Sequence, residues 1–419
     1  TISENKVTID PTADLSVDTI YHISYPSGCF TNNEGTDYVG TAYTFQARGY
    51  DYQLWVWGQN DYGQLGLNNR TQYSSPTQVS GSTWATTAVA YDGKNQLATK
   101  TDGTLWVWGS NSKGNLGVNN RTTYSSPVQV PGTTWATATT YASHSLASRT
   151  DGTLWSMGYN NAGQLGQNQG GVPTDRSSPT QIPGTTWGTG YKKFGVGLYN
   201  SMAVKTDGTL WSWGYNWYGI LGLNEASSTA YKSSPTQIPG TTWKSVNCGE
   251  RSALAIKTDG TMWSWGRNTF GELGLNNRTD YSSPKQIPGT TWSELGGGGY
   301  IFNFATKTDG TLWSWGYNGK GRLGVNNSTP SVYAYSSPVQ IPGTTWDTSA
   351  TGLAKSAQGG TWALKTDGTL WSWGYNNNGQ LGQNSTTMVS SPVQVGSDTT
   401  WIKVHNGIGG YAVAAIKKV

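Results

Sequence analysis

The sequence predicts an all-β protein, a seven-bladed β-propeller of four-stranded blades, and three observations lead to this prediction. The pattern Leu/Met-Trp-x-Trp/Met-Gly-x-Asn-x-x-Gly-x-Leu-Gly returns at intervals of 49 to 58 residues, beginning at Leu54, Leu105, Leu154, Leu210, Met262, Leu312 and Leu370. A period of this size indicates a repeat fold. Asp-Gly stands between alternating runs in most copies, and nearly all of the 22 Trp fall at repeat positions. Four short strands per unit are typical of a propeller blade.

The first 48 residues precede the repeats and predict a separate β segment. Alternating apolar residues within 7–25 indicate two strands, and 43–47 indicate a further one. The segment resembles the C-terminal part of a bacterial immunoglobulin-like domain, through Asp10-Pro11, Asp14-Leu15, Thr19, Tyr21, Gly28, Phe30, Gly35, Tyr38, Gly40 and Phe45. A complete sandwich of that kind needs about 100 residues. The resemblance therefore implies a partial domain over 1–48, joined by a linker at 49–53 to a propeller at 54–419.

Within each repeat, two strands are expected before the Asp-Gly turn and a third after it. The first begins at a Trp, namely Trp84, Trp135, Trp187, Trp243, Trp292, Trp346 or Trp401. The second is an alternating run such as 252–257. Asp-Gly is a strong hairpin signal, because it tolerates the positive φ angles of a tight turn. In the third strand, Trp263 and Trp265 are two residues apart and should point to one face of the sheet, where they would pack between blades.

A glycine turn and an edge strand complete the repeat. The Asn-x-x-Gly-x-Leu-Gly segment permits left-handed backbone at its glycines. Ser-Ser-Pro then occurs seven times, once per repeat. A strand is expected to start at its proline, as at Pro284, because proline is tolerated best at the start of an edge strand.

These repeats resemble the regulator of chromosome condensation repeat. Cys248-Gly249 and Leu254-Ala255-Ile256 match the first half of that motif, and Gln380-Leu381-Gly382 matches the second. The histidine of the motif survives only at His144. The resemblance covers residues 54 to 417 and implies a seven-bladed propeller. It implies little about function, because one fold can serve many tasks.

The two ends of the repeat region are expected to share one blade. Strands one and two occur at 401–404 and 411–417 with no hairpin after them, whereas a third strand without its own first strand occurs at 54–58. Pairing the C-terminal strands with residues 54–79 would close the ring.

Composition and motifs argue against catalysis and for a binding or structural protein. The net charge is +4, with no run of Lys or Arg longer than two, which is too weak for a nucleic-acid surface. No apolar stretch is long enough to span a membrane. His22, His144 and His405 are scattered, and the recurring Asp residues belong to turns, so neither a catalytic site nor a metal site is predicted, and no cofactor is expected. Cys29 and Cys248 are expected to be lone buried thiols.

A basic residue precedes each hairpin and should form a ring on one rim. The seven are Lys100, Arg149, Lys205, Lys257, Lys307, Lys365 and Lys417. Pairing with the turn Asp or simple solvation is one interpretation, and an anionic glycan or phosphate partner is the other.

The candidate binding residues are the ones at which the copies disagree. The two positions between Asn and Gly vary while their neighbours hold, which suggests exposed loop tips. Aromatic and basic residues there are suited to protein or sugar contact. The candidates are Tyr62, Lys113, Trp217, Tyr218, Phe270 and Lys320.

The expected function is an extracellular, non-enzymatic binding or structural module. The resemblances imply a phage virion protein, such as a fibre or decoration protein, or a bacterial surface protein that attaches to a protein or glycan on a cell or virion surface. Assembly through the upstream immunoglobulin-like region or as a homo-oligomer would fit this role. The alternative is a secreted propeller that inhibits β-lactamases.

Overall fold

The computed structural model of the chain describes residues 2–3, 6–7, 20–23, 43–46, 52–89, 94–141, 143–170, 174–225, 231–296, 301–327, 333–349, 352–355, 359–406 and 411–419. The chain divides into two compact units, Thr1–Asp51 and Tyr52–Val419. Along these described ranges, no helix is long and apolar enough to cross a membrane.

The smaller unit contains two antiparallel strand pairs. Strand β1 (Ile2–Ser3) pairs with β2 (Lys6–Val7), and β3 (Ile20–Ile23) pairs with β4 (Tyr43–Gln46). Strands are thus confirmed at 20–23 and 43–46. Most residues that carry the immunoglobulin-like resemblance, and also Cys29, lie outside the described residues.

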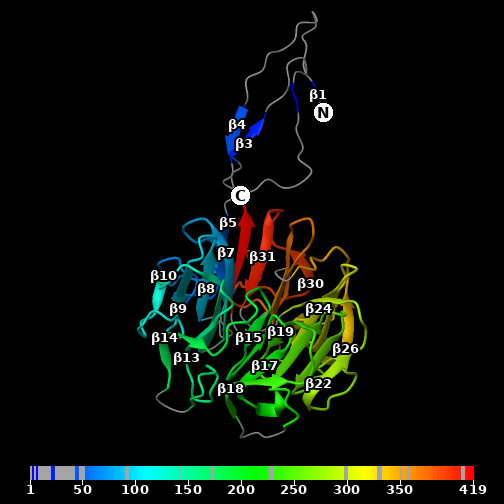
Figure 1. The fold of residues 1–419 in the computed structure, drawn as a ribbon. Coiled ribbons are helices and arrows are strands. Elements are labelled where there is room, and N and C mark those ends of the chain that lie inside the picture. Colours follow the sequence, from blue (N-terminus) through cyan, green and yellow to red (C-terminus); the bar gives the residue numbers. More distant parts are fainter. Residues whose placement is uncertain are drawn as a thin grey trace, which may run out of the picture. The chain divides into compact units, whose positions relative to one another are not determined.

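The larger unit is a seven-bladed propeller, and each blade is a four-stranded antiparallel sheet in the described part of the chain (Figure 1). The first blade is β31 (Trp401–Asn406), β32 (Ala412–Lys418), β5 (Tyr52–Gly58) and β6 (Tyr73–Gln78). The second is β7 (Trp84–Val89), β8 (Asn95–Lys100), β9 (Leu105–Gly109) and β10 (Tyr124–Val130). The third is β11 (Trp135–Tyr141), β12 (His144–Arg149), β13 (Leu154–Gly158) and β14 (Arg176–Ile182). The fourth is β15 (Phe194–Val196), β16 (Asn200–Val204), β17 (Leu210–Tyr215) and β18 (Tyr231–Ile238).

The remaining blades follow in chain order. The fifth is β19 (Trp243–Cys248), β20 (Ser252–Lys257), β21 (Met262–Gly266) and β22 (Tyr281–Ile287). The sixth is β23 (Trp292–Leu295), β24 (Phe302–Lys307), β25 (Leu312–Tyr317) and β26 (Ala334–Ile341). The seventh is β27 (Leu353–Lys355), β28 (Gly360–Leu364), β29 (Leu370–Gly374) and β30 (Val389–Gln394). Two short 3₁₀ turns, η1 (Trp217–Gly219) and η2 (Gly319–Gly321), follow β17 and β25.

The predicted closure of the ring is confirmed. Strand β32 pairs antiparallel with β5 from Ala412↔Gly58 to Lys418↔Tyr52. The first blade therefore takes its two inner strands from the C-terminal end of the chain and its two outer strands from residues 52–78 (Figure 1).

Two details of the strand predictions were wrong. Proline does not start the fourth strand. Pro76, for example, lies inside β6 beside a register shift, where a missing N–H removes no regular ladder bond. In the fourth and seventh blades, Trp187 and Trp346 form only isolated bridges before β15 and β27 begin. In the fourth blade, the Gly188 N–H still bonds to the Val204 carbonyl at 2.9 Å, and the Val204 N–H then bonds to the Lys193 carbonyl at 2.7 Å, so the chain bulges out between Gly188 and Lys193. In the seventh blade, a turn closed by Asp347 and Ser349 follows the bridge.

Tryptophan packing holds neighbouring blades together, as the sequence predicted. The second Trp of strand three donates its indole N–H to a carbonyl of the preceding blade at 2.7–3.1 Å, in the pairs Trp57–Gln380, Trp108–Gln64, Trp213–Gln164, Trp265–Ile220, Trp315–Glu272 and Trp373–Arg322. A Cβ on the last glycine of the preceding tip would lie only 2.4–2.9 Å from the indole nitrogen, or from the Met157 sulfur in the third blade. Only glycine therefore allows this close approach.

Candidate functional site

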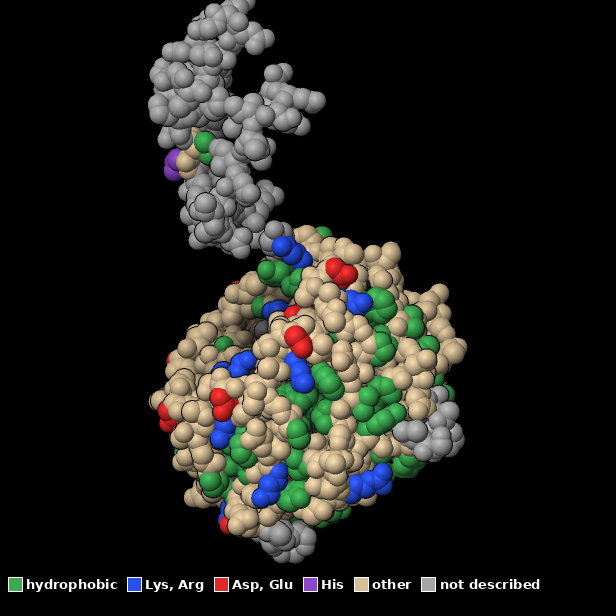
Figure 2. Space-filling model, turned by 90° about the vertical axis from the view of Figure 1, so that its right-hand side faces the viewer, with side chains coloured by type: hydrophobic (Ala, Val, Ile, Leu, Met, Phe, Trp, Pro, Cys, Tyr) green, Lys and Arg blue, Asp and Glu red, His purple; other side chains and the backbone are tan. Residues whose placement is uncertain are grey.

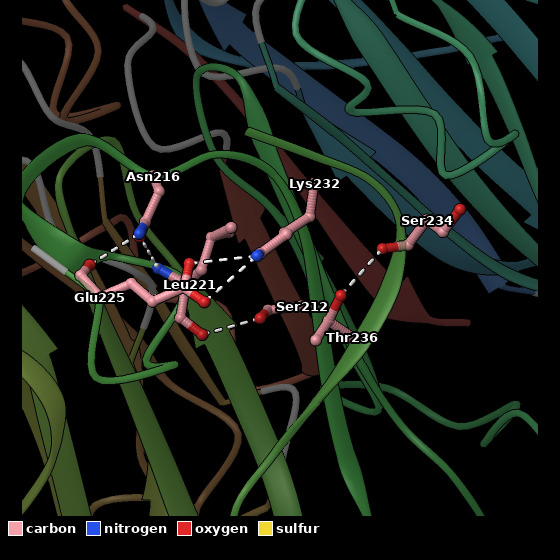
Figure 3. A network of polar contacts seen from close by, with 7 residues as sticks. All are labelled: Ser212, Asn216, Leu221, Glu225, Lys232, Ser234 and Thr236. Carbon is pink, nitrogen blue, oxygen red and sulfur yellow. Dashed lines mark hydrogen bonds and ion pairs between the residues drawn. The ribbon is translucent and has the colours of Figure 1, made fainter. Parts of the chain in front are cut away.

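Each loop tip between strands three and four is held by a buried asparagine. In the fourth blade, Asn216 donates from Nδ2 to the Glu225 carbonyl at 2.7 Å, and its Oδ1 accepts the Leu221 N–H at 3.0 Å (Figure 3). Ser212 Oγ donates to the Leu221 carbonyl at 2.7 Å, and Lys232 forms a 3.1 Å ion pair with Glu225. The backbone of the tip is thus fixed from below, while its two variable residues project from it.

The tip of the fourth blade presents two stacked aromatic rings. The centroids of Trp217 and Tyr218 lie 6.1 Å apart with an interplanar angle of 29°. These residues are 38% and 37% exposed, unlike the second Trp of each strand three, such as Trp213, which is fully buried. Tyr218 adopts φ = 55°, which is unusual for a bulky residue. Such strain is found more often at binding and active sites than elsewhere.

Two arginines connect these rings to the fifth blade. The Arg251 guanidinium lies 5.8 Å from the Trp217 ring and 5.9 Å from the Tyr218 ring. The Arg267 guanidinium lies 5.6 Å from Tyr218 and 5.7 Å from Phe270. These distances fit cation–π contacts, which are stronger where water is partly excluded.

The aromatic surface continues onto the sixth blade. Phe270 packs on Tyr317 at 5.2 Å, and Tyr317 meets Tyr333 edge-on at 4.6 Å. Burial and the hydrogen bond to Tyr333 raise the pKa of Tyr317 above its usual value. We call Trp217, Tyr218, Arg251, Arg267, Phe270, Tyr317 and Tyr333 the tip cluster. It crosses three blades without a break.

The structure brings together three of the six candidate residues. Trp217, Tyr218 and Phe270 belong to the tip cluster. Tyr62, Lys113 and Lys320 lie at other tips, and each contacts the next blade. The contacts are Lys94 over Tyr62 at 5.5 Å, Lys113 over Tyr159 at 4.9 Å and Lys320 over Tyr375 at 3.9 Å. The variable tip positions therefore also serve blade-to-blade packing.

Sequence reasoning missed Arg251, Arg267, Tyr317 and Tyr333. A signal for two of them was present, because the residue between the strand-three glycine and the tip asparagine is Tyr or Arg in five of the seven copies. Tyr333 follows the variable loop and is 51% exposed. Nothing in its spacing placed it beside Phe270.

The basic residues before the hairpins have a role that neither interpretation foresaw. In the described part of the chain, each of the seven cations lies 4.1–5.2 Å from two Trp rings, one of strand one and one of strand three. The hairpin Asp instead accepts from the following Thr, as Asp309 does from Thr311 Oγ1 at 2.6 Å, and this bond lowers the pKa of Asp309. Cation–π packing thus accounts for the placement of these residues, and Lys417 also forms an ion pair with Asp398.

Buried polar side chains outside the tips are structural. His144 bonds through Nε2 to Ser201 Oγ at 3.0 Å, and burial lowers its pKa to about 3. The buried Cys248 thiol donates to Asn200 Oδ1, and burial raises the pKa of this thiol. Within the described ranges, no group of three His, Cys, Asp or Glu could hold a metal ion. Figure 2 shows Lys and Arg dispersed singly over the face drawn.

Comparisons with known proteins agree with this architecture. The RCC1-like domain family matches residues 38–361, and the regulator of chromosome condensation (RCC1) repeat matches 367–413. The ultraviolet-B receptor UVR8 of Arabidopsis thaliana is 28% identical over 228 residues, which cover 54% of this chain and 51% of UVR8. Human protein RCC2 is 34% identical over 80 residues, covering 19% of this chain and 15% of RCC2. The matched region thus spans about half of UVR8 and much less of RCC2.

Solved structures with the same fold cover most of the chain. Human WBSCR16 has a TM-score of 0.75 at 20% identity, over 88% of this chain and 99% of that one. Yeast RCC1 (Prp20), in complex with Kap60, has a TM-score of 0.74 at 18% identity, over 88% and 90%. At such identities the likeness establishes the fold alone.

Proposed function

The chain belongs to the RCC1-like domain family, and on this premise we propose that it is a non-enzymatic binding module whose tip cluster docks a partner protein. The observation that supports the proposal is the tip cluster itself, in which exposed Trp217, Tyr218 and Tyr333 are linked across three adjacent blades by partly buried arginines and aromatics. Trp, Tyr and Arg are the residues that most often dominate binding energy at protein interfaces.

The family relatives are compatible with a binding role. The structures of yeast Prp20 concern its complex with Kap60 and its binding to Gsp1p and histones. These relatives show that a propeller of this fold can bind other proteins. The weak net charge of +4 gives no support to a chromatin partner for this chain.

We further propose an extracellular setting, on a virion or a bacterial surface. Low charge content, near-identical repeats and the immunoglobulin-like resemblance of residues 1–48 support this setting. A domain upstream of the propeller would then connect it to a particle or cell, or assemble several copies. In this setting the partner is a protein or glycan on a cell or virion surface. Under the alternative, in which the propeller is a secreted inhibitor, the partner is a β-lactamase.

The experiment compares the tip cluster with a matched tip. The double variant Trp217→Ala, Tyr218→Ala removes the two exposed rings, and Asn377→Ala, Asn378→Ala changes the same positions of the seventh blade. Biolayer interferometry would measure binding to purified host surface proteins, envelope glycans and β-lactamases. We expect the first variant to weaken binding to one of these partners by about thirtyfold or more, as for loss of a hot spot.

The control should keep wild-type affinity. If both variants lose affinity equally, the tip cluster is not the docking site. Selective binding to a β-lactamase would instead support the inhibitor alternative.

A further inference from the structure

Arg267 stands at a position of the tip cluster where four other blades carry tyrosine. The position follows the strand-three glycine, and its tyrosines are Tyr159, Tyr215, Tyr317 and Tyr375. The Arg267 N–H bonds to the Arg251 carbonyl at 2.8 Å, and the four tyrosines bond in the same way within their own blades, at 2.7–3.0 Å. The backbone thus follows the repeat, and the difference at this position lies in the side chain.

Two aromatic rings and one hydrogen bond hold the Arg267 guanidinium in place. Its carbon lies 5.6 Å from the centroid of the Tyr218 ring and 5.7 Å from that of Phe270. Nε donates to Thr269 Oγ1 at 2.8 Å. Neither terminal nitrogen makes a hydrogen bond or an ion pair within the described part of the chain, and both keep contact with solvent. A planar guanidinium presents two such nitrogens as a fork that fits both oxygens of one carboxylate.

No nearby carboxylate pairs with Arg267 among the described residues. Glu250 forms its 3.0 Å ion pair with Arg251 instead. The Asp280 carboxylate accepts a backbone N–H of the tip at 2.7 Å. Glu272 acts on Arg267 electrostatically, but burial raises the pKa of Glu272 to about 7, so at about pH 6 this carboxyl is mostly neutral. A carboxylate from outside the chain would therefore supply an opposite charge that the tip cluster lacks.

We propose that the tip cluster recognises an acidic side chain of the partner protein, flanked by apolar residues, and that Arg267 binds its carboxylate. The two rings beside the guanidinium exclude part of the water, which strengthens a charge-assisted hydrogen bond. The apolar neighbours of the acidic residue would pack on the exposed rings of Trp217 and Tyr218. This inference rests on the proposed function, because it specifies the chemistry of the partner at the same surface.

The test measures the binding of short blocked peptides to the full chain by NMR. The probes are Gly-Phe-Asp-Phe-Gly and its counterparts with Asn or Arg in the centre, at about pH 6, where Glu272 is mostly neutral. The indole N–H signal of the exposed Trp217, assigned with Trp217→Phe, reports binding. We expect the Asp peptide to bind about fivefold more tightly than the Asn peptide, as for one charge-assisted pair at a partly exposed site, and the Arg peptide to bind most weakly.

Two variants of Arg267 test its role in this preference. Arg267→Tyr introduces the residue of four other blades, so it should fold, and it should abolish the preference for Asp over Asn. Arg267→Lys keeps the charge but loses the fork, and should leave a preference of about twofold. As the control, Arg70→Gln removes one exposed positive charge from the first blade, outside the tip cluster, and should keep the full preference.

Three results would overturn the acidic partner while leaving the tip cluster as a docking surface. The wild-type chain binds the Asp and Asn peptides equally, or Arg267→Tyr keeps the full preference, or the preference disappears in Arg70→Gln as well, which would show that net charge causes it. If none of the three peptides shifts the Trp217 signal, both this inference and the proposed docking surface are contradicted.

Discussion

Glu272 lies at a position where three other blades carry glutamine. Its Oε2 accepts the Phe270 N–H at 2.7 Å, as Gln64, Gln164 and Gln380 accept the matching N–H in their own tips at 2.8–2.9 Å. Its other oxygen is buried without a partner in the described structure. Burial therefore disfavours the carboxylate and raises the pKa of Glu272 to about 7. The residue directly supports the backbone of a tip in the candidate site.

Glu272→Gln should stabilise the protein at alkaline pH. A raised pKa means that the folded state holds a proton that the unfolded state has lost, so stability is full below the unfolded value near 4.5 and falls until the pH passes about 7. The variant should lose this decline and gain about 1–2 kcal/mol at pH 8.5, a discounted value for a shift of this size.

Urea unfolding from pH 5 to 8.5 measures the effect. Glu225→Gln, at an exposed carboxylate, is the control and should keep the wild-type slope. A decline of equal steepness in Glu272→Gln would show that this carboxyl does not cause it.

At the scale of the blade, the third copy is the exception. Met157 replaces the second Trp of strand three. The Asn115 carbonyl therefore accepts a hydrogen bond from Ser145 Oγ alone, at 2.8 Å, and none from an indole. In the fourth blade, Trp213 and Ser201 both donate to the Gln164 carbonyl, at 2.9 Å each. The junction between the second and third blades thus has one hydrogen bond fewer.

Met157→Trp should be tolerated and should raise the melting temperature by about 2 °C, whereas Trp213→Met should cost about 2–3 kcal/mol. The reason is that the indole adds, or removes, a buried hydrogen bond and aromatic contact between blades. Differential scanning calorimetry of both variants measures this. Destabilisation by both substitutions alike would show that the third blade has repacked around Met157.

The repeat itself could be read from the sequence because each copy uses the same local signals. Asp-Gly, the paired Trp and the tip glycines fixed strands two and three to within a few residues. The late start of strand one in the fourth blade could not be read, because Trp187 stands in the same sequence pattern as the other strand-one Trp residues but forms only an isolated bridge, and the chain bulges before β15 begins at Phe194. The tip cluster was predicted only in part. Arg251 comes from a different blade than Trp217 and 34 residues later, so only the fold brings them together.

At the scale of the whole molecule, closure of the ring makes stability depend on the last strands. Val413 and Ala415 of β32 pack with Trp57 of β5 and with the seventh blade. Removal of these strands would expose the first blade and the seventh together.

Deletion of residues 401–419 should abolish cooperative unfolding, because it removes both inner strands of the first blade and uncovers buried side chains of two blades, whereas a typical domain is stable by only about 5–15 kcal/mol. Circular dichroism and calorimetry would show a broad transition or none. As a control, deletion of Val419 alone, which follows β32, should leave the melt unchanged. A sharp unfolding transition in the 401–419 deletion would mean that the propeller folds cooperatively without the two inner strands of its first blade.

The pairing of Lys418 with Tyr52 places two distant parts of the chain side by side in one sheet. The propeller can therefore be circularly permuted. A Thr-Asp-Gly-Thr linker from Lys417 to Leu54 would rebuild the hairpin that the other six blades possess, and new ends could be opened at another Asp-Gly turn. The buried indole N–H of Trp55 has no acceptor among the described residues, whereas the equivalent Trp of each other blade donates to the Thr of its hairpin, as Trp106 does to Thr104 at 2.8 Å. In the permutant, Trp55 would gain such a threonine, and the tryptophan of the blade that is opened would lose its own, so the place of the cut would decide which indole lacks an acceptor.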